Sequence, residues 1–137
     1  MKDKLLDMLI IDEGYRQKPY RCTEGFLTIG IGFNIDAGMD LELAKIIAKY
    51  FIDKRQAELT KALPWFKELD ENRKIALLNM AFQMGSAGLL KFQRTLKAIE
   101  EKRYKDAASH MLDSLWARQT PLRARRIAKI IETGQLP

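Results

Sequence analysis

The 137-residue chain contains a single cysteine, Cys22, and a single histidine, His110. One cysteine cannot form an internal disulfide, and one thiolate with one imidazole falls short of the four ligands of a structural zinc site. We therefore expect a protein that has no disulfide and that works without a metal or a cofactor.

Long apolar runs are also absent. The run from Leu5 to Ile11 is interrupted by Asp7, and no run approaches the roughly 18 to 20 residues that a membrane-spanning helix needs. These features predict a soluble protein without a signal peptide or stable membrane insertion. With 47% hydrophobic residues, the chain is long enough for one core, so we expect a single domain over residues 1–137.

Acidic residues are fewer than basic ones, 18 against 24, which gives a net charge of +6. The excess favours approach to a polyanion, which could be nucleic acid, anionic lipid or cell wall. It is concentrated late in the chain, at Arg118, Arg123, Arg125, Arg126 and Lys129. No aromatic residues interleave with these arginines to stack on bases, which argues against nucleic acid.

The first expected helix covers Lys2 to Asp12, where apolar residues recur at helical spacing. Asp3 is placed to cap its start, and Gly14 is placed to end it in the left-handed conformation. Residues 15–38 lack a helical period, are rich in glycine and include β-prone segments. A small hairpin region fits this stretch best, with a tight turn closed by the run from Thr28 to Gly32.

The rest of the chain has helical patterns. Asp40 is placed to cap a long helix that runs to about Ala62, where Pro64 stops it. The last expected helix begins with Pro121 in its first turn and ends at Gly134. Its N-cap is expected at Thr120 and its apolar stripe at Ala124, Ile127, Ala128 and Ile131. The expected short helices cover Pro64 to Leu69, Asn72 to Met84, Leu89 to Glu101, Tyr104 to Ser114 and Pro121 to Glu132.

Glu13, Cys22 and Thr28 stand at the end of the first helix and in the turn-rich stretch after it, close enough in sequence to line one cleft. Taken singly, a glutamate before a glycine is usually a solvated residue at a helix end, and a lone cysteine is usually a small buried apolar residue. Together, a carboxyl, a thiol and a hydroxyl at this spacing suggest acid/base hydrolysis.

Five sequence blocks in one order resemble the phage T4-type lysozymes, the endolysins of glycoside hydrolase family 24. The blocks are Ile11–Gly14, Thr23–Gly25, Thr28–Gly32, Asn79–Gly85 and Trp116–Pro121. The resemblance covers about Leu5 to Gly134. It implies an α+β, predominantly α-helical, lysozyme-like fold. It also implies a small hairpin-containing lobe at about residues 13–40, a connecting helix at about 41–62, and a helical lobe at about 63–137 against which the first helix packs.

The resemblance also implies roles for individual residues. Glu13 matches the family's catalytic acid, Thr28 its active-site threonine, and Cys22 the position where most members have aspartate. Arg123 matches an arginine that pairs with the catalytic glutamate. Positions that border the sugar cleft are matched by Asn34, Phe82, Gln83, Thr95 and His110.

Cys22 changes the expected chemistry, because an ordinary thiol with a pKa of about 8.5 is only a few per cent thiolate at pH 7. Either a neighbouring cation such as Arg21 or Lys18 lowers its pKa, or a small thiolate fraction acts as base or nucleophile. Whether water attacks directly or a thioglycosyl intermediate forms stays open at this point.

The implied function is that of a muramidase, which hydrolyses the β-1,4 bond from N-acetylmuramic acid to N-acetylglucosamine in peptidoglycan during host cell lysis. We expect a monomer that accumulates in the host cytoplasm, reaches the wall after the membrane is permeabilised, and is attracted to anionic wall polymers. The alternative is a basic wall-binding protein whose catalysis is weak or lost.

Overall fold

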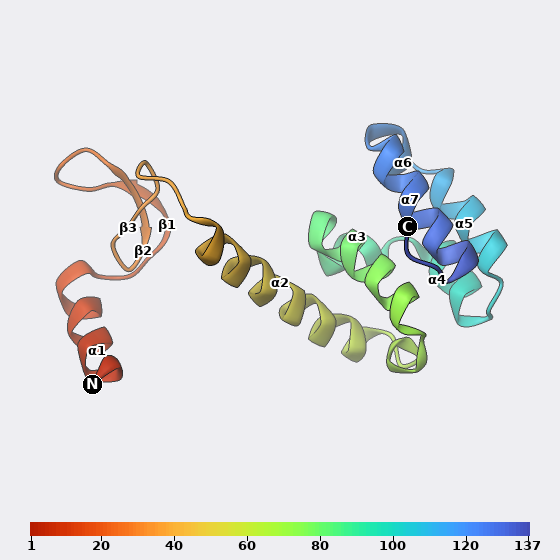
Figure 1. The fold of residues 1–137 in the computed structure, drawn as a ribbon, viewed down its shortest axis with the longest axis horizontal. Helices are drawn as coiled ribbons and strands as arrows, with labels where there is room; N and C mark the ends of the chain where they lie inside the picture. The colour runs from red at the N-terminus through yellow and green to blue at the C-terminus, as the bar shows by residue number, and fades with distance from the viewer. The chain divides into compact units, whose positions relative to one another are not determined.

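The computed structural model describes residues 1–137 and contains seven α-helices, one short 3₁₀ helix and a three-stranded antiparallel sheet (Figure 1). The predicted α+β, predominantly helical class is therefore confirmed. The contacts divide the chain into two compact units, Met1–Ile47 and Ala48–Pro137, and the boundary falls inside helix α2 (Leu41–Ala62). No single helix is long and apolar enough to cross a bilayer; only α3 and α4 taken together, bent by 99°, have the length and composition.

Helix α1 (Lys2–Glu13) opens the first unit. The prediction that Asp3 caps this helix was wrong, because Met1 is the N-cap and no side chain bonds to the first turn. Gly14 ends the helix with φ 72° and ψ 172°. The positive φ was expected, but the extended ψ sends the chain directly towards the first strand instead of into a left-handed turn.

The sheet has the strand order β1 (Arg16–Arg21), β2 (Leu27–Gly30), β3 (Phe33–Asn34). Strand β1 lies in the expected hairpin region but was not itself predicted, and it contains Pro19, which a central strand would not tolerate. Proline is accommodated here because β1 pairs only with β2 and its register shifts between Arg16 and Tyr20. In the sheet, Thr28 pairs with Tyr20 on one side and with Asn34 on the other.

Helix α2 begins as predicted. The Asp40 carboxylate accepts a hydrogen bond of 2.8 Å from the Leu43 amide, which satisfies one of the free donors of the first turn. The helix ends at Ala62, two residues before Pro64, because proline cannot continue the hydrogen-bond ladder.

The second unit contains the remaining helices. Their bounds are η1 (Phe66–Glu68), α3 (Glu71–Leu90), α4 (Gln93–Glu100), α5 (Tyr104–Leu112), α6 (Leu115–Gln119) and α7 (Pro121–Thr133). Helix α3 is kinked at Gly85, whose φ of 79° and ψ of 159° are not helical. Helix α6 was missed by the sequence analysis. It is a separate short helix because the Ser114 side chain caps it, accepting a bond of 3.2 Å from the Ala117 amide.

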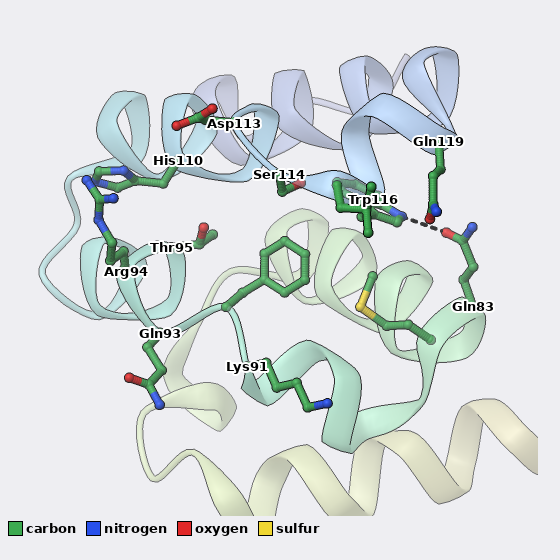
Figure 2. A pocket seen from close by; sticks show the side chains of 13 residues that line it. Gln83, Lys91, Gln93, Arg94, Thr95, His110, Asp113, Ser114, Trp116 and Gln119 are labelled. Atoms are coloured by element: carbon green, nitrogen blue, oxygen red, sulfur yellow. Dashed lines mark hydrogen bonds between the residues drawn. The ribbon is translucent and has the colours of Figure 1, made fainter.

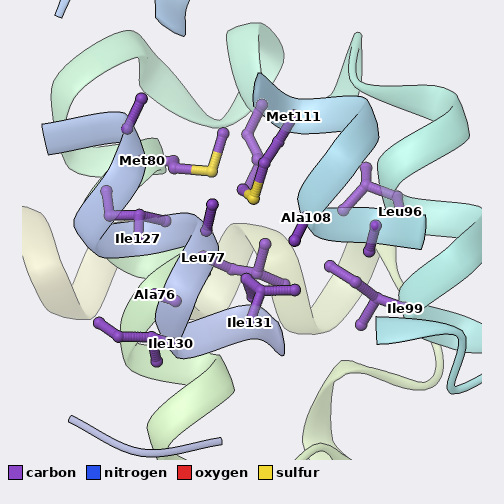
Figure 3. Close-up of a cluster of buried hydrophobic side chains, with 14 of the residues drawn as sticks. Ala76, Leu77, Met80, Leu96, Ile99, Ala108, Met111, Ile127, Ile130 and Ile131 are labelled. Carbon is purple, nitrogen blue, oxygen red and sulfur yellow. The ribbon is translucent and has the colours of Figure 1, made fainter. Parts of the chain in front are cut away.

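The core of the second unit lies where α7 packs against α3 and α5 (Figure 3). Met80 and Leu77 of α3 meet Met111 of α5 and Ile127 and Ile131 of α7, and all five side chains are at most 2% exposed. The predicted stripe of α7 is confirmed, since Ala124, Ile127, Ala128 and Ile131 are all buried. Gly134 ends α7 in the left-handed conformation as predicted, with φ 74° and ψ 12°.

The end of α7 is also held by Arg73 of α3. Its Nε donates to the Ile131 carbonyl at 2.7 Å and its Nη2 to the Glu132 carbonyl at 3.2 Å. Its guanidinium also lies 3.5 Å from the centre of the Tyr104 ring. Arg73 therefore joins α3, α5 and α7 and satisfies carbonyls that a helix end leaves free.

Candidate functional site

The Glu13 carboxyl lies against the turn between β2 and β3. A Cβ atom on Gly32 would lie 2.7 Å from Oε2 of Glu13 and 2.9 Å from its Cδ. Gly32 also has a φ of 68°, which side chains rarely allow. Gly32 thus allows the tight turn and leaves space for the Glu13 carboxyl. The end of α1 therefore lies against the hairpin at this turn.

Cys22 lies in the turn after β1 and is partly buried. Its amide donates to the Phe26 carbonyl and its carbonyl accepts from the Gly25 amide, both at 2.9 Å. Partial burial alone would raise the pKa of Cys22. Hydrogen bonds from the backbone of Glu24 and Phe26 and from the Thr28 side chain outweigh that effect, so the pKa of the thiol lies below its ordinary value.

These hydrogen bonds correct one expectation. The sequence analysis looked to the cations Arg21 or Lys18 for a lowered thiol pKa, and neither is among its causes. Arg21 instead donates to the Gly25 carbonyl at 3.1 Å and lies 3.5 Å from the Asp36 carboxylate. The turn itself supplies the donors, which no charge pattern in the sequence reveals.

Thr28 is 4% exposed, and its hydroxyl donates to the Phe26 carbonyl at 2.9 Å. A hydroxyl has one proton and two acceptor sites, so in this orientation it can still accept the S–H of a neutral Cys22. To donate to a Cys22 thiolate, the hydroxyl would have to rotate away from the Phe26 carbonyl. Thr28 can therefore serve both protonation states of the thiol.

Asn34 faces Thr28 across the hairpin, but its side chain is engaged locally, since its Oδ1 accepts from the Ala37 amide at 3.2 Å. The first unit thus holds four of the residues singled out from the sequence, Glu13, Cys22, Thr28 and Asn34, on the end of α1 and the small sheet. No group of three or more histidine, cysteine, aspartate or glutamate side chains is arranged to hold a metal ion.

The second unit has a cavity of about 760 Å³ between α3, α4, α5 and α6 (Figure 2). Three residues that the sequence analysis assigned to the sugar cleft, Gln83, Thr95 and His110, all line it. Gln83 comes from α3, Thr95 from α4 and His110 from α5, so the fold gathers them from three helices. A volume of this size lies within the range of small-ligand sites.

Trp116 was interpreted from the sequence as a core residue, and it is indeed only 9% exposed. Its indole Nε1 also donates to Oε1 of Gln83 at 2.8 Å, as Figure 2 shows. The Phe92 ring meets the indole edge-on, with 6.0 Å between ring centres. The hydrogen bond fixes the orientation of the Gln83 amide and leaves its NH₂ group and the second acceptor site of its oxygen for a ligand.

Phe82 and Arg123 lie elsewhere in this unit. Both line a second, smaller cavity of about 330 Å³, which is mostly apolar. Arg123 donates from Nε to Oδ1 of Asn79 at 2.9 Å and from Nη2 to the Asn79 carbonyl at 3.3 Å. The pairing of Arg123 with Glu13 and the contact of Phe82 with sugar stay predictions.

Three charged residues of the larger cavity were not singled out from the sequence: Lys91, Arg94 and Asp113. Each lies at a helix end, where the lost helical period hides which way a side chain faces. The sequence did indicate an uncapped start of α4. Phe92, at the N-cap, has no side-chain acceptor for the amides of the first turn.

Comparison with known proteins shows the family of the chain. The family model for phage lysozymes matches residues 11–129. Probable T4-type lysozymes 1 and 2 of Dictyostelium discoideum are 36% and 35% identical over 99% of this chain and 98% of theirs. The pre-baseplate central spike protein Gp5 of Enterobacteria phage T4 is 32% identical over 96% of this chain, which spans 28% of that protein.

Fold and site together define a glycoside hydrolase that acts on the bacterial cell wall. The chain belongs to the phage lysozyme family and is similar to the T4-type lysozymes, as the sequence blocks predicted.

Proposed function

We propose that this lysozyme cleaves the β-1,4 bond between N-acetylmuramic acid and N-acetylglucosamine in peptidoglycan, and that it serves host cell lysis. The observation that carries the proposal is the position of the Glu13 carboxyl on the Gly32 turn. Cys22, in the turn after β1, and Thr28, in β2, belong to the same unit, so a proton donor and a water-activating group are presented by one unit of the fold.

In this mechanism Glu13 gives its proton to the glycosidic oxygen as the bond to the anomeric carbon breaks. The Cys22 thiolate takes a proton from water, and the resulting hydroxide adds to the anomeric carbon. Thr28 holds the sulfur and the water. Exchange with solvent returns the proton from the thiol to the Glu13 carboxylate and closes the cycle.

The lowered pKa of Cys22 supports its role, because the thiolate is a larger fraction of the side chain at neutral pH than in an ordinary cysteine. A thiolate could also attack the anomeric carbon itself and retain its configuration. We favour water attack, with inversion, by analogy with the family.

Substrate contacts are assigned on both units. Gln83, Thr95 and His110 line one cavity in the second unit, and we assign them to the sugar chain. Asn34 beside the hairpin and Phe82, whose side chain is 45% exposed, are assigned to the same substrate. Arg123 is assigned as the partner of the catalytic glutamate.

The basic surface is proposed to attract anionic wall polymers. Arg118, Arg125, Arg126 and Lys129 are exposed, and none of them forms an ion pair in the protein. Such attraction weakens as the Debye length falls to about 10 Å at 0.1 M salt. We further propose a monomer that stays in the host cytoplasm until the membrane is permeabilised.

One observation favours a second candidate function, a wall-binding protein with weak catalysis. Cys22 is a thiol where most family members are expected to have a carboxylate, and a neutral thiol does not stabilise positive charge at the anomeric carbon. The two functions differ in turnover, which is directly measurable.

The test is digestion of purified peptidoglycan followed by borohydride reduction of the new sugar ends. A muramidase yields reduced muramic acid, and Glu13→Gln abolishes its formation while the protein remains folded. Reduced glucosamine would mean that the other glycosidic bond is cleaved. Binding to the wall without new reducing ends would favour the second candidate.

A further inference from the structure

The amide of Leu27, at the start of β2, lies beyond the end of the neighbouring strand. Strand β3 is only two residues long, and the last residue of β2 that it reaches is Thr28. The Asp36 carboxylate takes the place of a strand acceptor, with 2.7 Å between its Oδ2 and the Leu27 nitrogen. Asp36 therefore fixes β2 at the point where the chain leaves the turn that contains Cys22.

The same carboxylate oxygen also meets the residue on the other side of this turn. It lies 3.5 Å from Nη1 of Arg21, and this Nη1 donates to the Gly25 carbonyl at 3.1 Å. The side chains of Arg21 and Asp36 are 67% and 44% exposed, so their ion pair itself contributes little to stability. What the contacts do is hold the Gly25 carbonyl in one orientation.

The Gly25 carbonyl belongs to the same peptide group as the Phe26 amide. No peptide bond in the chain is cis, and in a planar trans peptide the C=O and the N–H point in opposite directions. A hydrogen bond from the backbone of Phe26 is one of the causes that lower the pKa of Cys22. Because Arg21 holds the carbonyl on one side of this peptide, the amide is directed to the other side, where the sulfur lies.

We propose that Arg21 and Asp36 are positioning residues for Cys22: Asp36 holds the guanidinium of Arg21, and Arg21 holds the peptide group before Phe26 with its amide towards the thiol. The consequence for turnover rests on the proposed function, in which the Cys22 thiolate activates water. A smaller thiolate fraction leaves less of that group, so the loss of either positioning residue lowers kcat and leaves KM nearly unchanged.

The charged groups around the turn allow a geometrical effect to be separated from an electrostatic one. Glu24 acts on the thiol through its charge and raises the pKa of Cys22, whereas neither Arg21 nor Asp36 is a direct cause of the lowered pKa. If charge alone acted, loss of the Arg21 cation would raise the pKa of Cys22 and loss of the Asp36 anion would lower it. Positioning through one peptide group predicts that both losses raise it.

The experiment measures the alkylation of Cys22 by iodoacetamide as a function of pH in Arg21→Gln and Asp36→Asn. We expect the midpoint to rise by about half a pH unit to one unit in both variants, and kcat on peptidoglycan at neutral pH to fall about threefold to tenfold. Asp36→Ala, which also removes the acceptor of the Leu27 amide, should shift the midpoint at least as far. The matched controls are Lys18→Gln and Asp7→Asn, which remove the same charges from exposed side chains that form no ion pair and should leave the midpoint in place.

Nuclear magnetic resonance of the Phe26 amide provides a direct reading of the contact. In the wild type its proton signal is expected to shift as Cys22 ionises, and in Arg21→Gln and Asp36→Asn this response should fall by about half or more. Midpoints that move in opposite directions in the two variants, or that move in neither, overturn the proposal, as does an equal shift in the controls. Failure of the proposed function is seen separately. Midpoints and amide signals that change as predicted, with no loss of peptidoglycan cleavage, keep the positioning role and reject Cys22 as the group that activates water.

Discussion

The carboxyl of Glu13 occupies the space that a side chain at position 32 would need, with Oε2 of Glu13 only 2.7 Å from a Cβ built on Gly32. The end of α1 can lie against the turn between β2 and β3 because residue 32 is a glycine and has no side chain. This contact explains how a side chain at the exposed end of α1 acquires a defined position at the turn between β2 and β3.

Gly32→Ala is expected to displace the Glu13 carboxyl and reduce wall hydrolysis at least about tenfold, because a misplaced proton donor loses its geometry with the bond. The matched control is Gly30→Ala. Gly30 has nearly the same φ, 67° against 68°, but nothing lies within 4 Å of its added Cβ. Both variants should lose about 1–2 kcal/mol of stability, while only Gly32→Ala loses turnover. Equal turnover in the two variants would remove the contact from the mechanism.

The rate of alkylation of Cys22 by iodoacetamide is expected to rise with pH about a midpoint below that of an ordinary thiol, because hydrogen bonds lower the pKa of Cys22. Thr28→Val removes one of these donors and should move the midpoint upward. Since the folded pKa is depressed, the stabilising effect of the thiolate is present above the unfolded pKa and is lost as pH falls through the folded pKa. A midpoint at the value of a free thiol would contradict the hydrogen-bonded turn.

Arg73→Ala is expected to cost about 2–3 kcal/mol in urea unfolding, since it frees two carbonyls at the end of α7 and removes the guanidinium from the Tyr104 ring. Arg103→Ala serves as the comparison. Arg103 makes two ion pairs but its side chain is 45% exposed, and exposed pairs contribute about 1 kcal/mol or less. Similar losses in both variants would mean that Arg73 does not tie the helices together.

Trp116→Phe is expected to raise KM about threefold to tenfold with little change in kcat, because Gln83 loses the donor that fixes its amide. Trp65→Phe is the control, as Trp65 lines a different cavity and makes no contact with Gln83. Steady-state kinetics on a soluble peptidoglycan fragment provide the measurement. A fall in kcat alone would instead assign Trp116 to the chemical step.

Helix α7 could be predicted almost completely from sequence, because its signals depend only on nearby residues. Apolar residues recur at helical spacing, Pro121 begins the helix and Gly134 ends it. Strand β1 could not, because Pro19 is tolerated only by virtue of the strand's place at the sheet edge, which is a property of pairing. The helix expected over Tyr104 to Ser114 ends at Leu112, and α6 follows it as a separate helix, because Ser114 caps α6 instead of ending α5.

For the site, the sequence predicted which residue types carry the chemistry but not what surrounds them. The donors that lower the pKa of Cys22 include backbone amides, which every residue has, so they leave no mark in the sequence. Arg94 was passed over because it lies in the first turn of α4, where the helical period does not yet indicate which way a side chain faces. The fit of Glu13 to Gly32 likewise depends on a turn that forms only in the fold.

The most direct test of the proposed mechanism is the rate of dye release from labelled peptidoglycan by Cys22→Ala measured beside Cys22→Asp. We predict that the alanine variant loses nearly all activity, because no group remains to activate water, and that the aspartate variant retains it, because a carboxylate performs the same task. Full activity in Cys22→Ala would contradict the proposed role of the thiol.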